Sequence, residues 1–163
     1  MGFRIFVWIA FILGGIAVSK LLDRFIFNVK FHFNVLMFSI GIILLLLSFY
    51  ISSKTGKLLK KFGKEGNVPR FQTNKLVREG IYSCMRHPMH LGLMLIPFGI
   101  AFLINSPSYI LIIAPITAML IFVLIKTVEE PEAIKKFGDE YIRYMKEVPM
   151  FNLSLSCLKK LFQ

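Results

Sequence analysis

Four apolar runs separated by short polar connections dominate the chain. They cover residues 3–18, 33–51, 89–104 and 109–125. Only the second approaches the roughly 20 residues that cross a bilayer as a helix. The others need flanking Lys and Arg side chains, or a locally thinner bilayer, to cross. The pattern predicts an all-α integral membrane protein with about four transmembrane helices, the last two forming a C-terminal hairpin.

The polar connections predict how this single membrane domain is organised. We expect two N-terminal transmembrane helices in residues 1–52 and a basic connector in 53–87. A transmembrane hairpin in 88–126 and a cytoplasmic helix and tail in 127–163 complete the domain. Pro88 suits the first turn of the third helix because its missing N–H would be unpaired there anyway.

The C-terminal segment has its own pattern. Apolar side chains recur at helical spacing after Pro131, at Ile134, Phe137, Tyr141, Tyr144 and Val148. Such one-sided spacing predicts an amphipathic helix packed along one face. Gly138 within it costs about 1 kcal/mol relative to Ala, which indicates a break or close packing. The tail at 151–162, with its Leu and Lys residues, is typical of a segment at the membrane interface.

Composition and charge add an orientation. The chain is 56% hydrophobic with a net charge of +11, and its mean hydropathy is +0.67. Nine basic residues lie between Lys54 and Arg86, and seven follow from Lys126 onward. Because short basic segments stay inside, we expect the connector and both termini on the cytoplasmic side, although three basic residues in 20–30 argue against this. The charge indicates contact with anionic membrane lipids and not with nucleic acid.

Two features bear on targeting and redox state. Residues 17–19 are small-x-small, as before a signal-peptide cleavage site, but the poor basic start favours a retained first helix. Cys84 and Cys157 are the only cysteines, and both fall on segments expected in the cytoplasm. We therefore expect no disulfide framework.

Two polar clusters flank the predicted hairpin, and the hairpin returns them to one face. Arg86, His87 and His90 stand at its entrance, and Glu129 and Glu130 stand at its exit. A helix entrance offers unpaired N–H groups, and carboxylates this close to hydrocarbon are costly unless paired. The clusters predict a polar pocket. Read separately, they are also compatible with a basic anchor, interfacial histidines and a solvated helix end.

Tyr82 and the histidines have further readings. Tyr82 can stack on an aromatic ligand such as adenine, or belong to an interfacial tyrosine belt. No metal site is predicted, because the chain has three histidines and His32 is expected on the opposite face.

The spacing of these residues resembles a known family. Leu76-Val77-x-x-Gly80-x-Tyr82-x-x-x-Arg86-His87-Pro88-x-x-x-Gly92 is similar to the cofactor signature of the isoprenylcysteine carboxyl methyltransferase family. Glu129-Glu130, Phe137-Gly138-x-Glu140-Tyr141-x-x-Tyr144 and Val148-Pro149-x-Phe151 resemble its C-terminal signature, in the same order. The likeness covers about residues 74–151. Phospholipid methyltransferases and some membrane reductases share parts of it.

The resemblance implies an integral membrane enzyme that uses S-adenosylmethionine. It implies a cofactor pocket on the cytoplasmic side, formed by the connector and the hairpin ends. Carried over by position, the cofactor contacts are Asn74, Lys75, Leu76, Val77, Tyr82, His87, Pro88, Met89, His90 and Glu129. Gln72 is a further candidate. Lys126 and Glu130 are candidates for binding the acceptor, and the resemblance names no catalytic residue.

Two positions depart from the family pattern. His90 stands where the family usually has Tyr. Ile125 stands where the prenylcysteine enzymes have an Arg near the substrate carboxylate, with Lys126 beside it. Lys supplies a charge but not the two-pronged donor geometry of Arg, so the departure bears on the acceptor more than on the cofactor.

Three functions follow as hypotheses. The first is methyl transfer to a lipophilic or lipid-linked acceptor, with a carboxylate of the isoprenylcysteine type favoured. The second is N-methylation of a phospholipid amine, for which Glu130 or His90 would act as base. The third is a non-catalytic membrane adaptor that retains the fold, and a reductase or a small-thiol methyltransferase is a further possibility.

Overall fold

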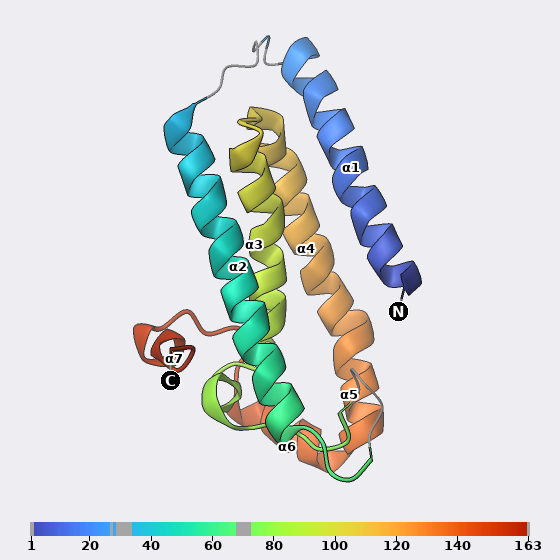
Figure 1. Cartoon of the computed structure of the whole chain (residues 1–163). Coiled ribbons are helices and arrows are strands. Elements are labelled where there is room, and N and C mark those ends of the chain that lie inside the picture. Colours follow the sequence, from blue (N-terminus) through green and yellow to red (C-terminus); the bar gives the residue numbers. More distant parts are fainter. Residues whose placement is uncertain (1, 27, 29–33, 68–72, 163) are drawn as a thin grey trace. The chain divides into compact units, whose positions relative to one another are not determined.

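The computed structural model describes residues 2–26, 28, 34–67 and 73–162, and over these residues the chain is helical with no strand. His32 and Gln72 lie outside the described residues. The long helices are α1 (Gly2–Phe25), α2 (Val35–Phe62), α3 (Pro88–Leu103) and α4 (Ala114–Leu124) (Figure 1). The shorter helices are α5 (Glu130–Phe137), α6 (Asp139–Glu147) and α7 (Leu155–Lys159). The 3₁₀ turn η1 (Gly80–Ser83) and the π turns η2 (Tyr109–Ile113) and η3 (Ile125–Glu129) complete the order.

Two helical stretches of the described chain are long and apolar enough to cross a membrane. They are Val35–Phe62 and Tyr109–Phe137, and Pro88–Leu103 is a shorter apolar helix. The all-helical prediction is therefore confirmed. The prediction of four crossings stays a prediction.

The chain folds into two compact units. The first comprises Met1–Leu46 and Met94–Leu120, and the second comprises Leu47–Leu93 and Ile121–Gln163. We call them unit 1 and unit 2 and describe each by itself.

In unit 1 the chain reverses between α3 and η2. Asn105, with φ of 49°, makes the turn. The carboxylate of Asp23, near the end of α1, accepts hydrogen bonds from the hydroxyls of Ser106 and Ser108 and from the backbone N–H of Ser108 at 2.8 Å. Asp23 thus satisfies donors that a helix start leaves unpaired. The core beneath the turn consists of Ala101, Tyr109 and Ala114.

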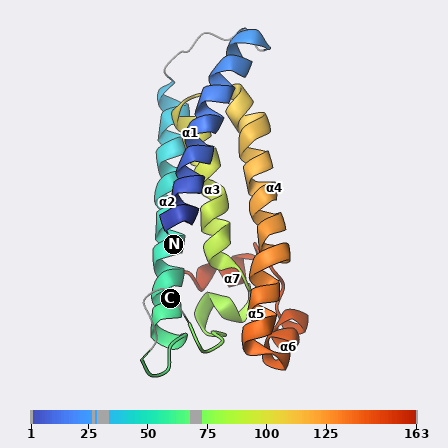
Figure 2. The ribbon, with the colours of Figure 1, turned by 90° about the vertical axis from the view of Figure 1, so that its right-hand side faces the viewer.

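In unit 2, α2 and the start of α3 touch closely. The Ser48 hydroxyl donates to the carbonyl of Gly92 at 2.7 Å. A Cβ at Gly92 would lie 2.9 Å from Ser52 Oγ, so only glycine allows this approach. The C-terminal segment then joins the entrance of α3, because the N–H groups of Arg86 and His87 donate to the carbonyls of Pro149 and Met150 at 3.0 and 3.2 Å. Figure 2 shows α6 and α7 beside this entrance.

The predicted amphipathic pattern after Pro131 is confirmed as a packed face. Tyr141, Tyr144 and Val148 form a buried cluster, with Ile134 and Phe137 packed against it. The helix nevertheless breaks at Gly138, whose φ is +57° and whose surroundings are open. Of the two readings for this glycine, the break is correct and close packing is wrong.

Helix lengths differ from the predicted runs in two places. The first helix runs to Phe25, beyond the apolar run that ends at Val18. The second runs to Phe62 and takes in ten residues of the predicted connector, 53–62. Both extensions mix charged and polar residues with apolar ones, so the length of an uninterrupted apolar run underestimates the helices.

The expectation of no disulfide is wrong. Cys84 and Cys157 form one, with their Cα atoms 5.8 Å apart. The prediction relied on the expected cytoplasmic position of both cysteines. Although 73 residues separate them in the sequence, the tail after Val148 returns to the turn at 80–84.

Candidate functional site: a polar pocket in unit 2

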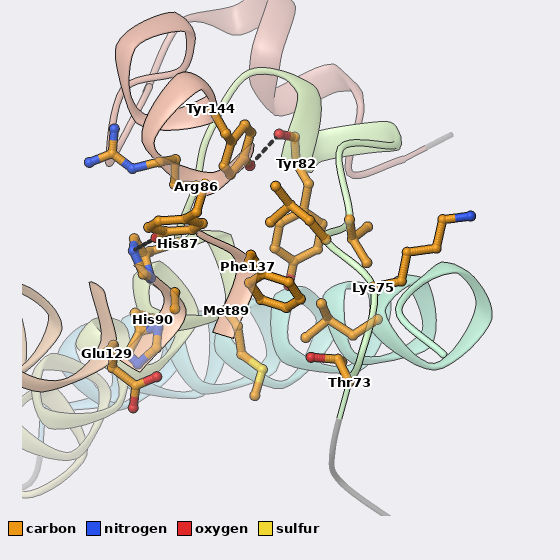
Figure 3. A pocket seen from close by; sticks show the side chains of 15 residues that line it. Thr73, Lys75, Tyr82, Arg86, His87, Met89, His90, Glu129, Phe137 and Tyr144 are labelled. Atoms are coloured by element: carbon orange, nitrogen blue, oxygen red, sulfur yellow. Dashed lines mark hydrogen bonds between the residues drawn. The ribbon is translucent and has the colours of Figure 1, made fainter. Parts of the chain in front are cut away.

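One cavity of unit 2, of about 230 Å³, collects most of the predicted site residues. Its lining comes from the connector, the start of α3 and the segment from η3 to α6 (Figure 3). The side chains are Leu59, Thr73, Lys75, Leu76, Val77, Tyr82, Arg86, His87, Met89, His90, Glu129, Ala133, Phe137, Tyr141 and Tyr144. Both arms of the split sequence signature therefore border the same cavity.

The connector wall is held by backbone and amide contacts. The N–H of Asn74 donates to the carbonyl of Gly63 at 2.9 Å. The Asn74 side chain accepts from the N–H of Glu65 at 2.8 Å and donates to its carbonyl at 2.7 Å. These bonds anchor the strip that begins at Lys75, and they engage the Asn74 amide in the loop and not in the cavity.

A π turn separates the roles of Glu129 and Glu130. Pro131 has no N–H to donate to the carbonyl of Thr127, which a regular helix would require. The turn η3 (Ile125–Glu129) lies directly before this point, as π turns often do at functional positions. Successive helical residues point about 100° apart. Glu129 consequently lines the cavity, whereas Glu130 is buried beside Arg86.

Arg86 is a buried clamp. Its Nε and Nη2 donate to Glu130 Oε1 at 3.1 and 2.6 Å. Its Nη1 donates to the carbonyls of Met145, at 3.0 Å, and of Val148. The two charged side chains are only 8% and 9% exposed. Because these bonds engage all three guanidinium nitrogens, Arg86 joins the entrance of α3 to both ends of the C-terminal segment.

His87 is neutral at neutral pH. Burial, followed by the nearby His90 and the charge of Arg86, lowers the pKa of His87 to about 3. Glu130 Oε1 lies 3.5 Å from His87 Nε2 and would favour the charged ring. That carboxylate is already neutralised by Arg86, so the loss of solvation on burial is the larger effect and the pKa of His87 falls. The hydroxyl of Tyr141 lies 3.4 Å from the same Nε2.

Three tyrosines form an aromatic wall. The Tyr144 hydroxyl donates to the backbone carbonyl of Tyr82 at 2.6 Å. The Tyr141 and Tyr144 rings meet edge to face, with centroids 5.9 Å apart. Burial raises the pKa of all three, that of Tyr141 to about 12, so each keeps its proton at neutral pH. Arg78 lies over the Tyr144 ring and pairs with Glu147, which covers the wall from outside.

Most of the predicted cofactor residues line the cavity. They are Lys75, Leu76, Val77, Tyr82, His87, Met89, His90 and Glu129. Asn74 and Pro88 are absent from the lining, Asn74 because of its bonds to Glu65 and Pro88 because it is buried at the start of α3. The two predicted acceptor residues are also absent: Glu130 pairs with Arg86, and the Lys126 ammonium lies 4.9 Å from the centre of the Phe122 ring.

The structure adds lining residues that sequence reasoning did not name as site residues. Phe137, Tyr141 and Tyr144 were noted for their helical spacing and as part of the C-terminal signature, and these were the available signals. Thr73 and Leu59 carried no recognisable signal. Leu59 lies on the extension of α2 that the apolar run did not predict.

The side chains that line the cavity suit a cationic ligand that also carries an aromatic ring. Figure 3 shows the His90 ring and the Glu129 carboxylate on the same side of the cavity, with Met89 between them and the aromatic residues. A carboxylate attracts a positive charge, and aromatic faces accept a planar ring or a cation. Ligand pockets usually measure roughly 300–1,000 Å³. The cavity of about 230 Å³ lies just below this range and is open to its surroundings.

Comparison with known families fits this chemistry. The phospholipid methyltransferase family matches residues 29–140. The chain belongs to this family. It is therefore a membrane protein of a methyltransferase family, as the resemblance of the two signatures implied.

One curated relative carries a more specific name. Methanethiol S-methyltransferase 1 of Bradyrhizobium diazoefficiens is 39% identical over 88 residues, which cover 54% of this chain and 28% of the relative. The match thus spans little more than a quarter of the relative's length. No solved structure shows a significant match.

Proposed function

We propose that this family member binds S-adenosylmethionine in the unit 2 cavity and transfers its methyl group to a thiol acceptor. The observation that carries the proposal is the meeting of the two signature arms around one cavity, with His90 and Glu129 side by side. When bound, the cofactor supplies a sulfonium-activated methyl group. The protein then has to position the acceptor in line and exclude water.

The residues present fit this cofactor. Glu129 supplies a carboxylate for the positively charged part or for the ribose hydroxyls. Tyr82 and Phe137 offer aromatic faces for the adenine. The strip at 75–77 runs without helical structure along the cavity. Its backbone groups, apart from the Lys75 N–H that donates to the carbonyl of Gly63 at 3.3 Å, therefore form no helical hydrogen bonds and are candidates for binding the cofactor. Arg86 and Glu130 act as positioning residues that hold the entrance of α3.

The charges around the cavity disfavour a carboxylate acceptor. Among the lining residues that the structure describes, the cations are Lys75, which is exposed, and Arg86, which is committed to Glu130. A carboxylate would meet the negative charge of Glu129 without a buried cation to pair with. Lys126, which the resemblance had placed near a carboxylate, does not line the cavity. We therefore rank a prenylcysteine carboxylate below a thiol.

A thiol acceptor has a base within the site. A thiol must lose its proton to become a strong nucleophile. His90, beside the Glu129 carboxylate, can accept that proton from the acceptor, and Glu130 cannot because Arg86 holds it. The relative named as a methanethiol S-methyltransferase supports the thiol class. The family description supports a phospholipid amine as second candidate, for which His90 would serve equally.

For the membrane arrangement we keep the prediction of four crossings with the cavity and both termini in the cytoplasm. The nine basic residues between Lys54 and Arg86 support it. A lipophilic acceptor would then arrive from the bilayer and the cofactor from the cytosol.

Cofactor binding is tested by calorimetry on the purified full chain in detergent. Glu129→Gln should weaken binding at least tenfold, about 1.4 kcal/mol. Glu132→Gln removes the same charge from an exposed neighbour outside the cavity and should leave binding unchanged. Equal affinities for the three proteins, or no binding at all, would refute the cofactor assignment.

The acceptor is tested with radiolabelled cofactor. Parallel reactions receive a short alkyl thiol, phosphatidylethanolamine vesicles and a farnesylcysteine mimic. We expect label in the thioether and loss of turnover in His90→Ala. Label only in the phospholipid would identify an amine as the acceptor, and label only in the farnesylcysteine mimic would identify a carboxylate. Label in none of the three would favour a non-catalytic adaptor.

A further inference from the structure

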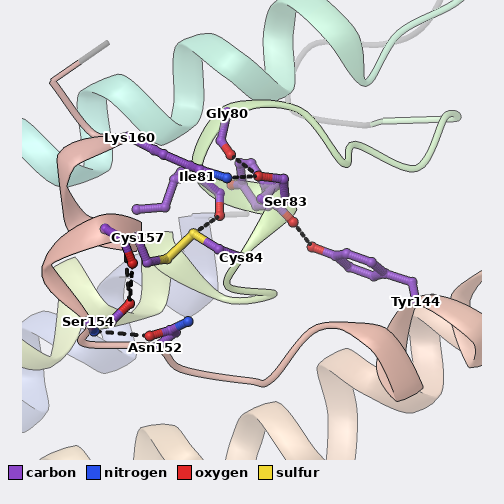
Figure 4. The surroundings of a disulfide bond; sticks show 11 residues. Gly80, Ile81, Ser83, Cys84, Tyr144, Asn152, Ser154, Cys157 and Lys160 are labelled. Carbon is purple, nitrogen blue, oxygen red and sulfur yellow. Dashed lines mark hydrogen bonds between the residues drawn. A yellow bond between two sulfur atoms is a disulfide. The ribbon is translucent and has the colours of Figure 1, made fainter.

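The Cys84–Cys157 disulfide joins the turn beside the pocket to the C-terminal tail. Cys84 directly follows η1, the turn that contains Tyr82. Cys157 is buried in α7, where its N–H donates to the hydroxyl of Ser154. Figure 4 shows the two sulfur atoms bridging these segments. No step of the proposed reaction uses this bond.

Apart from the disulfide, the tail is held to the rest of unit 2 by contacts that break readily. The Lys160 ammonium donates to the Ser83 hydroxyl at 2.6 Å in an exposed position. The Tyr50 hydroxyl donates to the carbonyl of Leu161 at 3.4 Å, and its ring stacks on Phe162 with centroids 5.5 Å apart. The exposed bond to Ser83 stabilises little, so the disulfide, together with the burial of Leu161, accounts for most of the attachment of α7.

The turn also carries part of the pocket wall. The carbonyl of Tyr82 accepts the hydroxyl of Tyr144, and the side chains of both line the cavity. The N–H groups of Cys84 and Met85 donate to the carbonyl of Ile81, each at 3.1 Å. The position of Cys84 is thereby coupled through one turn to the position of Tyr82. A displacement of Cys84 would therefore also shift Tyr82, a residue of the cavity wall two positions away.

We infer that Cys84 and Cys157 form a reversible thiol–disulfide site whose oxidised state holds the pocket in its ligand-binding form. Basic residues around the connector favour a cytoplasmic position, and thiols there are normally kept reduced. A disulfide at such a place is typically redox-sensing. Cys84 is partly exposed, which gives a reductant access.

The reaction is an exchange with a dithiol reductant. One thiolate of the reductant attacks a sulfur of the Cys84–Cys157 bond, forms a mixed disulfide and releases the other cysteine as a thiolate. The second thiol of the reductant displaces the first cysteine. Two electrons pass to the protein, which then holds two thiols, and the reductant leaves as a disulfide.

The test uses the full chain in detergent, equilibrated at a series of dithiothreitol ratios. Alkylation of free thiols followed by mass spectrometry measures the redox state, and limited proteolysis reports release of the tail. Calorimetry measures the affinity of the pocket for S-adenosylmethionine, and this part of the test rests on the proposed function. Cys157→Ser mimics the reduced state. Ser83→Ala, which removes the Lys160 contact but keeps the disulfide, is the matched control.

We expect reduction to expose residues 154–162 to protease and to weaken cofactor binding roughly fivefold or more, the lower end of couplings between linked sites. Cys157→Ser should behave like the reduced protein and ignore the reductant, and Ser83→Ala should still respond. Two free thiols at every ratio, a disulfide that resists reduction, or equal affinity in both states would overturn the inference. If neither state binds cofactor, the proposed function fails, and unchanged proteolysis would separately refute the switch.

Discussion

The two units treat their buried polar groups differently. In unit 1, the Asp23 carboxylate accepts hydrogen bonds from Ser106 and Ser108, and the cluster closes one turn. In unit 2, Arg86 and Glu130 form a buried ion pair that also binds backbone carbonyls of the C-terminal segment and lies beside His87. Both clusters join segments that are distant in sequence: Asp23 lies 83 and 85 residues from its serine partners, and Arg86 lies 44 to 62 residues from its partners. The first cluster holds a single carboxylate that closes a turn, whereas the second pairs two opposite charges.

The difference explains where chemistry is possible. The cavity of unit 1 is lined by apolar and glycine residues such as Phe11, Gly14 and Ile113, so it offers no group for catalysis. In unit 2 the buried ions Arg86 and Glu130 pair with each other. His90 and Glu129 are not part of this pair and line the cavity. A buried charge network stabilises a structure only when every member is paired. The pairing of Arg86 is thus a precondition for the pocket.

Arg86→Met should produce the largest effect on this contrast. It leaves the Glu130 carboxylate buried without a partner, which costs about 3–5 kcal/mol. Denaturant unfolding in mild detergent measures the free energy of unfolding. A loss below 1 kcal/mol would show that the pair contributes nothing to the joint of α3 and α6.

Asp23→Ala should cost less, about 1–2 kcal/mol, as expected for a lost helix cap. The same unfolding measurement gives the value, and cofactor affinity serves as the second readout. Because Asp23 belongs to unit 1 and does not line the unit 2 cavity, the affinity should stay unchanged. A tenfold loss of affinity would remove the distinction between the units.

Acidification should destabilise unit 2 through His87. Its pKa is about 3 in the folded chain, against an ordinary value of 6.5 for a solvent-exposed imidazole. The unfolded chain therefore takes up the proton first as pH falls below 6.5. This contribution to stability is complete above pH 6.5 and is lost progressively toward pH 3. It amounts to about 2 kcal/mol between pH 7 and pH 5.

Unfolding free energies of the native chain and of His87→Gln, measured from pH 7.5 to 5, test this slope. The variant should lose the part of the pH dependence that the imidazole supplies. Identical slopes would mean that His87 takes up protons equally in both states, contrary to its burial.

Lys126→Met should have the smallest effect. The ammonium lies over the exposed edge of unit 2, against the Phe122 ring, where such contacts contribute about 0.5–1 kcal/mol. We expect unchanged cofactor affinity by calorimetry and unchanged kcat/KM with the thiol acceptor. A selective rise in KM would restore Lys126 as an acceptor-binding residue.

Much of the site was predictable, and the failures have physical causes. The strip at 75–77 and the residues from Tyr82 to His90 were carried over from the family resemblance, which was recognisable because its signature is local to one loop and one helix entrance. The pairing of Glu130 with Arg86 was not predicted, because the two residues lie 44 positions apart in the sequence. The disulfide was missed because the prediction followed the expected compartment, and only the folded chain shows that the tail brings Cys157 to Cys84.

The sequence by itself determined the helical class, the membrane character and the family, because hydrophobic run length and motif spacing are properties of neighbouring residues. It also indicated that Glu129 and Glu130 matter, without separating them. The tertiary structure decided which of these two glutamates faces the cavity, that Arg86 pairs with Glu130, and that Cys84 pairs with Cys157. These outcomes depend on which distant groups reach each other, and burial and pairing energies exist only once the chain has folded.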